Sequence, residues 1–316
     1  MNTRLALFAA ALCCAVLLYP AARPTAAQQA ASTATSSWIS DLAFRYALTP
    51  DVTYMTANNY DDKLDVYVPP GNGPFPTLLY MHGGGWTNGT KDASGPGGTN
   101  PTAFVFLPFI EKGWAVVNVE YRVARISLAP AAVEDCRCAL RWTIQHAKEY
   151  KFDTNRVVAM GNSSGGHLAL TTGMLPSLAG LDRQCPGAQE LKVAAILDFY
   201  GITDVNELLD GPNMRPFAVT WLGSVPDRDQ VAKRVSPLTY VRAGLPPIMM
   251  IQGDADPTVP YTQSVRLQKA LDVAGVPNEL VTIPGGKHGQ FSRQEMDMIY
   301  THVWAFLGKY LPKAGS

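Results

Sequence analysis

Short apolar runs alternate with stretches of helical periodicity along most of the chain. The apolar runs are rich in Val, Ile and Leu and almost continuous, as is typical of strands buried on both faces. Strands and helices in alternation predict a mostly parallel central sheet with helices on both faces, an α/β fold. The predicted strands are 63–68, 77–82, 114–119, 156–160, 193–199, 247–252 and 279–283, and the predicted helices are 103–112, 131–150, 164–174, 262–274 and 293–310.

One segment, 203–242, departs from this alternation. It contains four prolines and the aromatic residues Phe217 and Trp221, and it lies where a strand should lead directly to the next helix. We expect a small cap inserted over the carboxyl edge of the sheet. A surface excursion with no role is the alternative. No linker-like composition divides 51–316, which we expect to form one domain that includes the cap.

The first residues have the pattern of a targeting segment. Arg4 is the only charge before an apolar run at 5–19, and small residues follow at 25–27. The run is shorter than the ~20 residues of a membrane-spanning helix. We therefore expect a signal peptide at 1–27, a leader at 28–50, export to the periplasm or medium, and no stable membrane insertion after cleavage. An N-terminal membrane anchor is the alternative.

Composition and charge narrow the classes of function. The chain of 316 residues is 47% hydrophobic and 16% charged, which excludes a disordered chain. Its 26 Lys and Arg balance 26 Asp and Glu, and no run of like charge occurs. Nucleic acid is therefore not an expected partner. Nothing in the composition indicates an oligomeric state.

Three cysteines follow the signal segment: Cys136, Cys138 and Cys185. An exported protein can form disulfides. On the predicted helix 131–150, Cys136 falls on the apolar face while Cys138 points elsewhere. This favours a Cys138–Cys185 bond, with a Cys136–Cys185 bond or three free thiols as the alternatives.

A glycine-flanked serine lies between a predicted strand and a predicted helix. The motif Gly161-Asn162-Ser163-Ser164-Gly165 follows the strand 156–160 and begins the helix 164–174. A sharp strand-to-helix turn needs small flanking residues, and it projects the side chain of its central residue above the sheet edge. The pattern favours Ser163 as a nucleophile. An ordinary glycine-rich turn is the alternative.

A second glycine-rich motif, His82-Gly83-Gly84-Gly85-Trp86, follows the strand 77–82. Successive glycines weaken helix and strand but leave backbone N–H groups accessible. We expect the amides of Gly84, Gly85 and Ser164 to form an oxyanion hole. His82 is expected to brace this loop rather than act as a base. Trp86 is expected either to wall a substrate pocket or to pack in the core.

A serine nucleophile needs a base, and the base needs an acid that holds its tautomer. Of the five histidines, His288 lies in a glycine-flanked loop after the last predicted strand, whereas His146 and His302 lie in long helical patterns. His167 is one helical turn beyond Ser163, so we expect it to be structural. His288 is therefore the predicted base.

The predicted acid lies in the turn Gly253-Asp254-Ala255-Asp256-Pro257, which follows the strand 247–252. Pro257 favours an extended conformation for Asp256. We therefore prefer Asp256 as the partner of His288, with Asp254 as the alternative.

The motifs HGGGW, GNSSGGHLA, GDADPTVP and KHG, in this order, resemble those of the α/β-hydrolase fold. Within it the chain is similar to bacterial hormone-sensitive-lipase-like carboxylesterases and to feruloyl and acetylxylan esterases. The order Ser163, Asp256, His288 is the one this fold uses. The resemblance implies a serine carboxylesterase that acts through an acyl-enzyme.

We expect short-chain or aromatic acyl esters as substrates, either small molecules or groups on plant polysaccharide. Trp86 and Trp221 are the predicted substrate-binding residues. The cap is short for a lipase. No metal-ligand spacing or phosphate-binding loop is visible, so neither a metal nor another cofactor is expected. An amide hydrolase, either a peptidase or an arylformamidase, and a non-catalytic binding module are the alternative functions.

Overall fold

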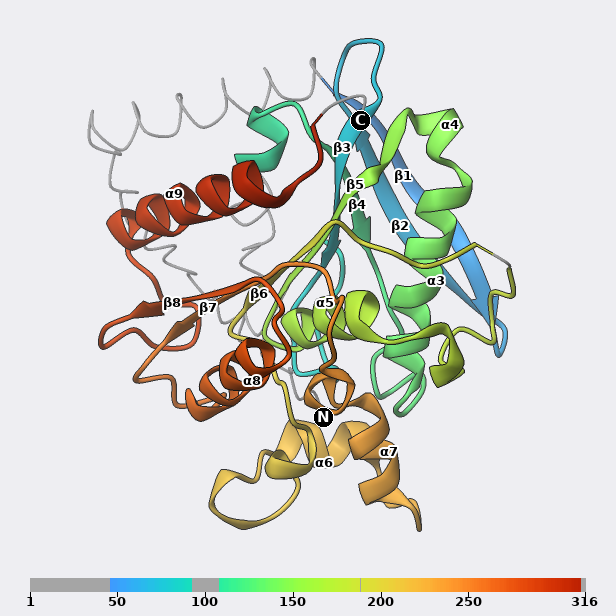
Figure 1. The fold of residues 1–316 in the computed structure, drawn as a ribbon. Coiled ribbons are helices and arrows are strands. Elements are labelled where there is room, and N and C mark those ends of the chain that lie inside the picture. The colour runs from blue at the N-terminus through green and yellow to red at the C-terminus, as the bar shows by residue number, and fades with distance from the viewer. Residues whose placement is uncertain (1–45, 93–107, 188, 314–316) are drawn as a thin grey trace, which may run out of the picture. The chain divides into compact units, whose positions relative to one another are not determined.

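The computed structural model describes residues 46–92, 108–187 and 189–313, which contain one eight-stranded sheet. The expected signal peptide and most of the leader lie outside these residues. The strand order is β1-β2-β4-β3-β5-β6-β7-β8, with the first two strands at one edge (Figure 1). The strands are β1 (Ala47–Ala57), β2 (Tyr60–Val68), β3 (Phe75–Met81), β4 (Ala115–Val119), β5 (Phe152–Asn162), β6 (Ala195–Phe199), β7 (Ile248–Gly253) and β8 (Asn278–Ile283).

The sheet is mostly parallel, as predicted. β1 pairs antiparallel with β2 and β2 antiparallel with β4, whereas every pairing from β4 through β8 is parallel. Every residue of β4, β6 and β7 is buried, because helices or loops cover both faces. The predicted α/β architecture with a mostly parallel central sheet is therefore confirmed.

β1 was not predicted, and it corrects the expected leader boundary. The strand begins at Ala47, so residues 47–50 belong to the sheet rather than to a leader that ends at position 50. Its first five residues are exposed and include Pro50, so they lack the apolar alternation that marks a half-buried strand. An edge strand tolerates both features.

Three of the helices coincide closely with predicted ones. α5 packs against α3 and against the central strands, while α9 contacts β6, β7 and β8. The predicted helix 131–150 is divided at His146, and the predicted helix 103–112 lies mostly outside the described residues. The three that coincide are α5 (Ser164–Met174), α8 (Thr262–Val273) and α9 (Arg293–Tyr310). The two parts of the divided helix are α3 (Ala131–Gln145) and α4 (Ala147–Tyr150).

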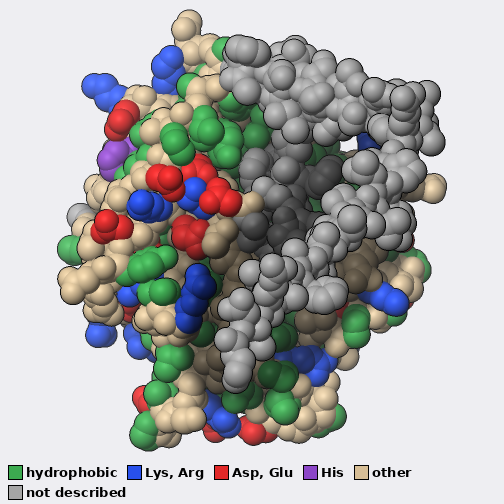
Figure 2. Space-filling view, turned by 180° about the vertical axis from the view of Figure 1, so that it is seen from behind, with side chains coloured by type: hydrophobic (Ala, Val, Ile, Leu, Met, Phe, Trp, Pro, Cys, Tyr) green, Lys and Arg blue, Asp and Glu red, His purple; other side chains and the backbone are tan. Residues whose placement is uncertain are grey.

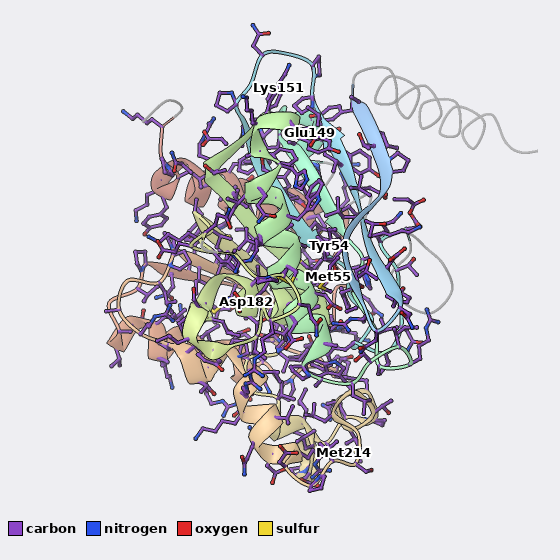
Figure 3. The ribbon with its side chains drawn as sticks, turned by 90° about the vertical axis from the view of Figure 1, so that its right-hand side faces the viewer. Tyr54, Met55, Glu149, Lys151, Asp182 and Met214 are labelled. Atoms are coloured by element: carbon purple, nitrogen blue, oxygen red, sulfur yellow. A yellow bond between two sulfur atoms is a disulfide. The ribbon has the colours of Figure 1, made fainter. Side chains whose placement is uncertain are left out.

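The segment 203–242 folds into short helices between β6 and β7. Figure 1 shows α6 (Pro216–Leu222) and α7 (Arg228–Val235) next to each other below α5, and Figure 3 places Met214 at the opposite end of the domain from Lys151. Three 3₁₀ turns complete the segment: η2 (Asn206–Leu208), η3 (Gly211–Asn213) and η4 (Pro237–Tyr240). We call 203–242 the cap.

The base of the cap is fixed to α8. The buried Gln263 side chain accepts a hydrogen bond from the Thr203 amide at 2.7 Å and donates one to the Asp204 carbonyl at 3.0 Å. Arg266 of the same helix pairs with Asp204 and Glu207. These contacts hold the start of the cap against the domain.

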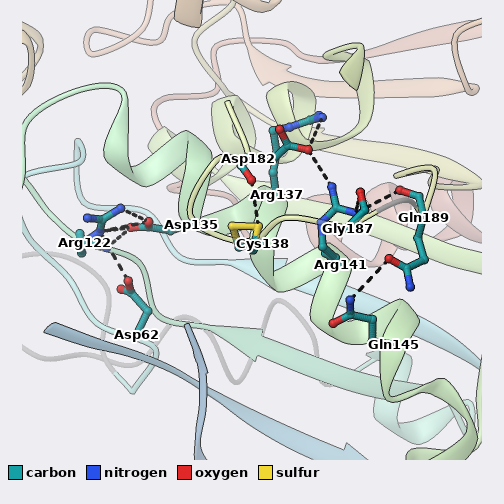
Figure 4. Close-up of a disulfide and its surroundings, with 11 residues drawn as sticks. Asp62, Arg122, Asp135, Arg137, Cys138, Arg141, Gln145, Asp182, Gly187 and Gln189 are labelled. Atoms are coloured by element: carbon teal, nitrogen blue, oxygen red, sulfur yellow. Dashed lines mark hydrogen bonds and ion pairs between the residues drawn. A yellow bond between two sulfur atoms is a disulfide. The ribbon is translucent and has the colours of Figure 1, made fainter. Parts of the chain in front are cut away.

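A disulfide joins α3 to the loop that follows α5 (Figure 4). The Cα atoms of Cys138 and Cys185 are 5.6 Å apart, and Cys136 is a buried free thiol. Arg141, one turn from Cys138, donates to Asp182 of the same loop at 2.7 Å. The preferred Cys138–Cys185 pairing is confirmed. Both Cys136 and Cys138 are buried in the core, so the expected difference between an apolar and an outward helical face is not seen in their exposure.

The described surface carries charges of both signs. Figure 2 shows Lys and Arg side chains interspersed with Asp and Glu on one face, as zero net charge leads one to expect. None of the helices within the described ranges combines the length and the hydropathy that crossing a bilayer requires.

Candidate active site

Ser163 lies on a strained turn between β5 and α5. Its backbone φ of 56° is in the left-handed region, with ψ at −121°. The flanking glycines are required because a Cβ at Gly165 would lie 2.1 Å from the Met81 carbonyl oxygen, and one at Gly161 would lie 2.2 Å from the Gly165 carbonyl oxygen. This close packing places the Ser163 side chain at the carboxyl edge of the sheet.

The structure brings Ser163, His288 and Asp256 into one hydrogen-bonded chain. Nε2 of His288 lies 2.9 Å from Ser163 Oγ, and Nδ1 lies 2.7 Å from Asp256 Oδ2. With its proton on Nδ1, the imidazole donates to the carboxylate and leaves Nε2 free to accept the serine proton. This is the arrangement that general-base activation of a hydroxyl requires.

Asp256 is held on both of its oxygens. Oδ1 accepts from the amides of Thr258 at 2.8 Å and Val259 at 3.0 Å, while Oδ2 faces His288. Burial alone would raise the pKa of this carboxyl, but the hydrogen bond and charge of His288 and the two amides outweigh burial and lower the pKa. The carboxylate is therefore ionised at neutral pH.

Asp254 has different surroundings. It is exposed, and its Oδ1 accepts from the Gly285 amide at 2.6 Å, which fixes the start of the loop that carries His288. The structure thus brings Asp256, the preferred residue, into contact with His288 and gives Asp254 a contact with the backbone.

The loop that contains Gly84 and Gly85 lies directly against the Ser163 turn. A Cβ at Gly83 would lie 2.7 Å from the Asn162 side chain, and Gly84 has a φ of 129°. Among the described residues, the amides of Gly84, Gly85 and Ser164 donate no hydrogen bond. The oxyanion hole expected at these amides stays a prediction.

His82 braces this loop, as expected. Its Nδ1 lies 2.7 Å from the Gly83 carbonyl oxygen, and its ring stacks on Tyr121 with the centroids 4.2 Å apart. The Tyr121 hydroxyl donates to the His82 carbonyl at 2.9 Å. The His82 side chain is fully buried, so it is not positioned to act as a base at the sheet edge.

Trp86 and Trp221 both pack in the core, which agrees with the second of the two expectations for Trp86 and corrects the substrate-binding expectation for Trp221. Both have 0% exposure, and their rings stack with centroids 4.2 Å apart. Trp86 Nε1 donates to Nδ1 of His167, whose Nε2 lies 2.7 Å from the Val235 carbonyl oxygen. Burial lowers the pKa of His167 to about 4, so it is neutral. The aromatic pair joins the cap to the domain core.

Two aromatic residues border the site instead. The Tyr200 ring contacts the His288 ring with a centroid distance of 4.7 Å. Phe217 of the cap is half-buried, and its Cβ lies 3.0 Å from the position that a Cβ on Gly85 would take. Tyr200 could have been predicted to lie near the site, because it directly follows the strand predicted to end at 199. Phe217 is one of the two aromatic residues that the sequence of the cap indicated, but its position next to Gly85 depends on how the cap packs.

A known protein family matches the part of the chain that carries most of these site residues. The family model described as BD-FAE matches residues 64–271, which carry Ser163, Asp256 and all three glycines of the 82–86 loop. His288 lies beyond the matched range. The match covers most of the described domain.

Several individual relatives are named as esterases. The chain is 28% identical to Esterase LipQ of Mycobacterium tuberculosis over 73% of this chain and 54% of that protein. It is 28% identical to ethyl acetate hydrolase of Pseudomonas putida, over 75% and 74% of the two chains. A thermophilic esterase of Thermogutta terrifontis, solved with propionate bound, aligns at a TM-score of 0.65 and 28% identity over 84% of this chain and 96% of that chain. The chain spans about half the length of the first curated relatives it matches.

Proposed function

The chain belongs to the BD-FAE family, and on that basis we propose that it is a serine carboxylesterase that acts through an acyl-enzyme on Ser163. The observation that carries the proposal is the continuous contact from Ser163 Oγ through His288 to Asp256, at 2.9 Å and 2.7 Å. A serine hydroxyl is a weak nucleophile without such a base.

In the first half of the reaction, His288 Nε2 takes the proton of Ser163 as Oγ forms a bond to the ester carbonyl carbon. The carbonyl oxygen becomes an oxyanion, which the amides of Gly84, Gly85 and Ser164 stabilise. The bond to the alcohol oxygen then breaks, and His288 gives its proton to the departing alcohol. In the second half, a water molecule loses a proton to His288, attacks the acyl carbon and releases the acid, and Ser163 Oγ regains its proton.

We propose short-chain and aromatic acyl esters as the substrates. Two relatives support a small acyl group: one is named for ethyl acetate, and the other was solved with propionate bound. Phe217 narrows the space beside Gly85, which disfavours a long acyl chain. Acetyl and feruloyl groups on plant polysaccharide are the proposed natural sources of such esters.

We also propose export to the periplasm or medium. The support is the apolar run at 5–19 with small residues behind it, together with the Cys138–Cys185 disulfide, since disulfides persist mainly outside the cytoplasm. Fractionation of cells that express the full chain tests this. Protein retained in the cytoplasm with its first residues intact would contradict it.

The test of the activity is a panel of p-nitrophenyl esters of increasing acyl length, with acetylated xylan, methyl ferulate and a p-nitroanilide alongside. We expect hydrolysis of acetate and butyrate esters, and a loss of about 10⁴–10⁶ in kcat in a folded Ser163→Ala variant. Faster cleavage of the anilide than of the esters would indicate an amide hydrolase. A preference for palmitate would indicate a lipase, and near-normal turnover without the Ser163 hydroxyl would exclude the proposed nucleophile.

A further inference from the structure

A cap arginine reaches the loop that carries Asp256. Arg215 directly precedes α6, and its side chain donates to two consecutive carbonyls: Nε to Thr258 at 2.7 Å and Nη2 to Pro257 at 3.2 Å. Its Nη1 donates to the carbonyl of Met214 at 3.1 Å. The half-buried guanidinium therefore spans from the cap to the residues that immediately follow Asp256.

The two carbonyls belong to the same peptide groups whose amides hold Asp256. The peptide between Pro257 and Thr258 accepts from Arg215 on its oxygen, and its N–H donates to Asp256 Oδ1 at 2.8 Å. The next peptide, between Thr258 and Val259, does the same, with its N–H at 3.0 Å from Oδ1. Each peptide thus links the guanidinium to the carboxylate.

Such a link has an electrostatic consequence. A peptide whose oxygen accepts a charge-assisted hydrogen bond is polarised, and its N–H becomes a stronger donor. Arg215 takes part in none of the ion pairs that the described residues form, so no carboxylate neutralises its charge by direct contact. Its positive charge is directed toward the Asp256 loop.

We propose that Arg215 is a positioning residue that couples the cap to the Ser163–His288–Asp256 chain by holding and polarising the two peptides that bind Asp256 Oδ1. The proposal rests on the proposed function, since it assigns Arg215 a role in the same reaction. Arg215 touches neither the nucleophile nor the base. Its loss should therefore affect the rate of bond formation at Ser163 more than the binding of substrate.

The experiment compares three variants of the full chain. Arg215→Met removes the charge and the donors while keeping the length, and Arg215→Lys keeps the charge but replaces the planar fork. Arg234→Met is the matched control, because Arg234 is also a cap arginine and donates to two backbone carbonyls, those of Ala179 and Gly180, at 3.0 Å and 3.1 Å. Those residues lie outside the Asp256 loop.

For Arg215→Met we expect kcat on p-nitrophenyl acetate to fall about tenfold, the scale of one hydrogen-bond contribution, with KM changed less than about twofold. Arg215→Lys should be intermediate, and Arg234→Met should retain wild-type kcat. Labelling of Ser163 by a fluorophosphonate should slow by the same factor as kcat. The far-downfield proton resonance of the His288–Asp256 hydrogen bond should shift in Arg215→Met, shift less in Arg215→Lys and stay unchanged in Arg234→Met.

Equal kcat in Arg215→Met and Arg234→Met, or a change confined to KM, would overturn the proposal. So would an unshifted proton resonance. Urea unfolding of each variant shows whether a lower kcat results from unfolding or from a mispositioned Asp256 loop. If Arg215→Met does not fold, Arg215→Lys takes its place in the comparison with Arg234→Met. A wild-type protein that neither cleaves esters nor reacts with the fluorophosphonate would refute the proposed function, while the proton resonance would still test the Arg215 contact.

Discussion

Asp254 and Asp256 lie two residues apart in one turn, yet they differ in burial and in hydrogen-bond partner, and both differences matter for catalysis. The Asp256 carboxylate is fully buried and bonded to His288, whereas Asp254 is exposed and bonded to the Gly285 amide. A buried acid can hold one tautomer of its histidine, because water does not compete for the hydrogen bond.

We therefore predict that Asp256→Asn lowers kcat by about 10⁴ by holding His288 in the wrong tautomer. Asp254→Asn should lower kcat far less, because it weakens only a contact that positions the His288 loop. Steady-state kinetics on p-nitrophenyl acetate measures both, and circular dichroism verifies that each variant is folded. Equal losses in the two variants would contradict the assignment of the acid.

Phe217 of the cap packs next to Gly85. We predict that Phe217→Ala extends the range of acyl chains that are cleaved efficiently. Each additional methylene that then finds room contributes up to ~0.8 kcal/mol. The ratio of kcat/KM for hexanoate to that for acetate should rise, as measured across the nitrophenyl ester panel.

Trp221→Ala is the contrasting variant. Trp221 is fully buried against Trp86, so its truncation should destabilise the protein by about 3–5 kcal/mol without altering acyl-length preference. An unchanged acyl-length profile in Phe217→Ala would show that this residue does not limit the acyl pocket.

At the scale of elements, the strands that are buried throughout were predicted well from their apolar runs, and the exposed edge strand was missed. β4, β6 and β7 are buried along their whole length, so their apolar runs marked them to within two residues. β1 lies at the sheet edge with exposed residues, and its sequence has no comparable pattern. The break of the predicted helix at His146 depends on contacts within the last turn, where Nδ1 lies 2.9 Å from the Trp142 carbonyl oxygen.

The disulfide links two such elements, α3 and the loop after α5. Its cysteines are 47 residues apart, so the bond restricts a large part of the unfolded chain. We predict that Cys138→Ala with Cys185→Ala lowers the free energy of unfolding by about 2–4 kcal/mol. Cys136→Ala, which removes a thiol but no cross-link, should cost less. Equal urea midpoints for the oxidised and reduced wild-type protein would contradict this prediction.

Across the whole domain, the candidate site could be predicted because the α/β topology brings its residues together. Ser163, Asp256 and His288 each follow a strand, and parallel strands end at one edge of the sheet. Local patterns do not reveal which aromatic residues a cap will bury, so Trp221 was assigned to substrate. They also do not reveal contacts across 42 or 43 positions, such as those from Arg215 to the Asp256 loop.

A cluster of three buried charged residues, Arg122, Asp135 and Asp62, lies inside the domain and outside the candidate active site. Arg122 follows β4 and donates from Nε to both oxygens of Asp135 in α3 at 3.0 Å, while Asp62 of β2 lies 3.5 Å from the same Nε (Figure 4). Neither oxygen of Asp62 has a hydrogen-bond partner among the described residues. One cation therefore faces two buried carboxylates. Burial, and then the charge of Asp135, raise the pKa of Asp62 to about 8.

This arrangement predicts how the stability of the whole domain depends on pH. Between the ordinary Asp pKa of about 4 and the raised value, folded Asp62 keeps a proton that the unfolded chain has lost. The folded state then binds more protons, so the free energy of unfolding falls as pH rises through this window. Asp62→Asn removes the contribution of Asp62 to that dependence and should be more stable than the wild type near pH 8. Asp135, whose pKa burial raises to about 6, contributes a smaller dependence of the same sign. Asp135→Asn should instead lower the free energy of unfolding by about 3–5 kcal/mol, because it leaves the Arg122 guanidinium buried without its main partner. Urea unfolding at about pH 5 and about pH 8 measures how the free energy of unfolding changes with pH in the wild type and in each variant. If that change is as steep in Asp62→Asn as in the wild type, Asp62 is already ionised in the folded protein.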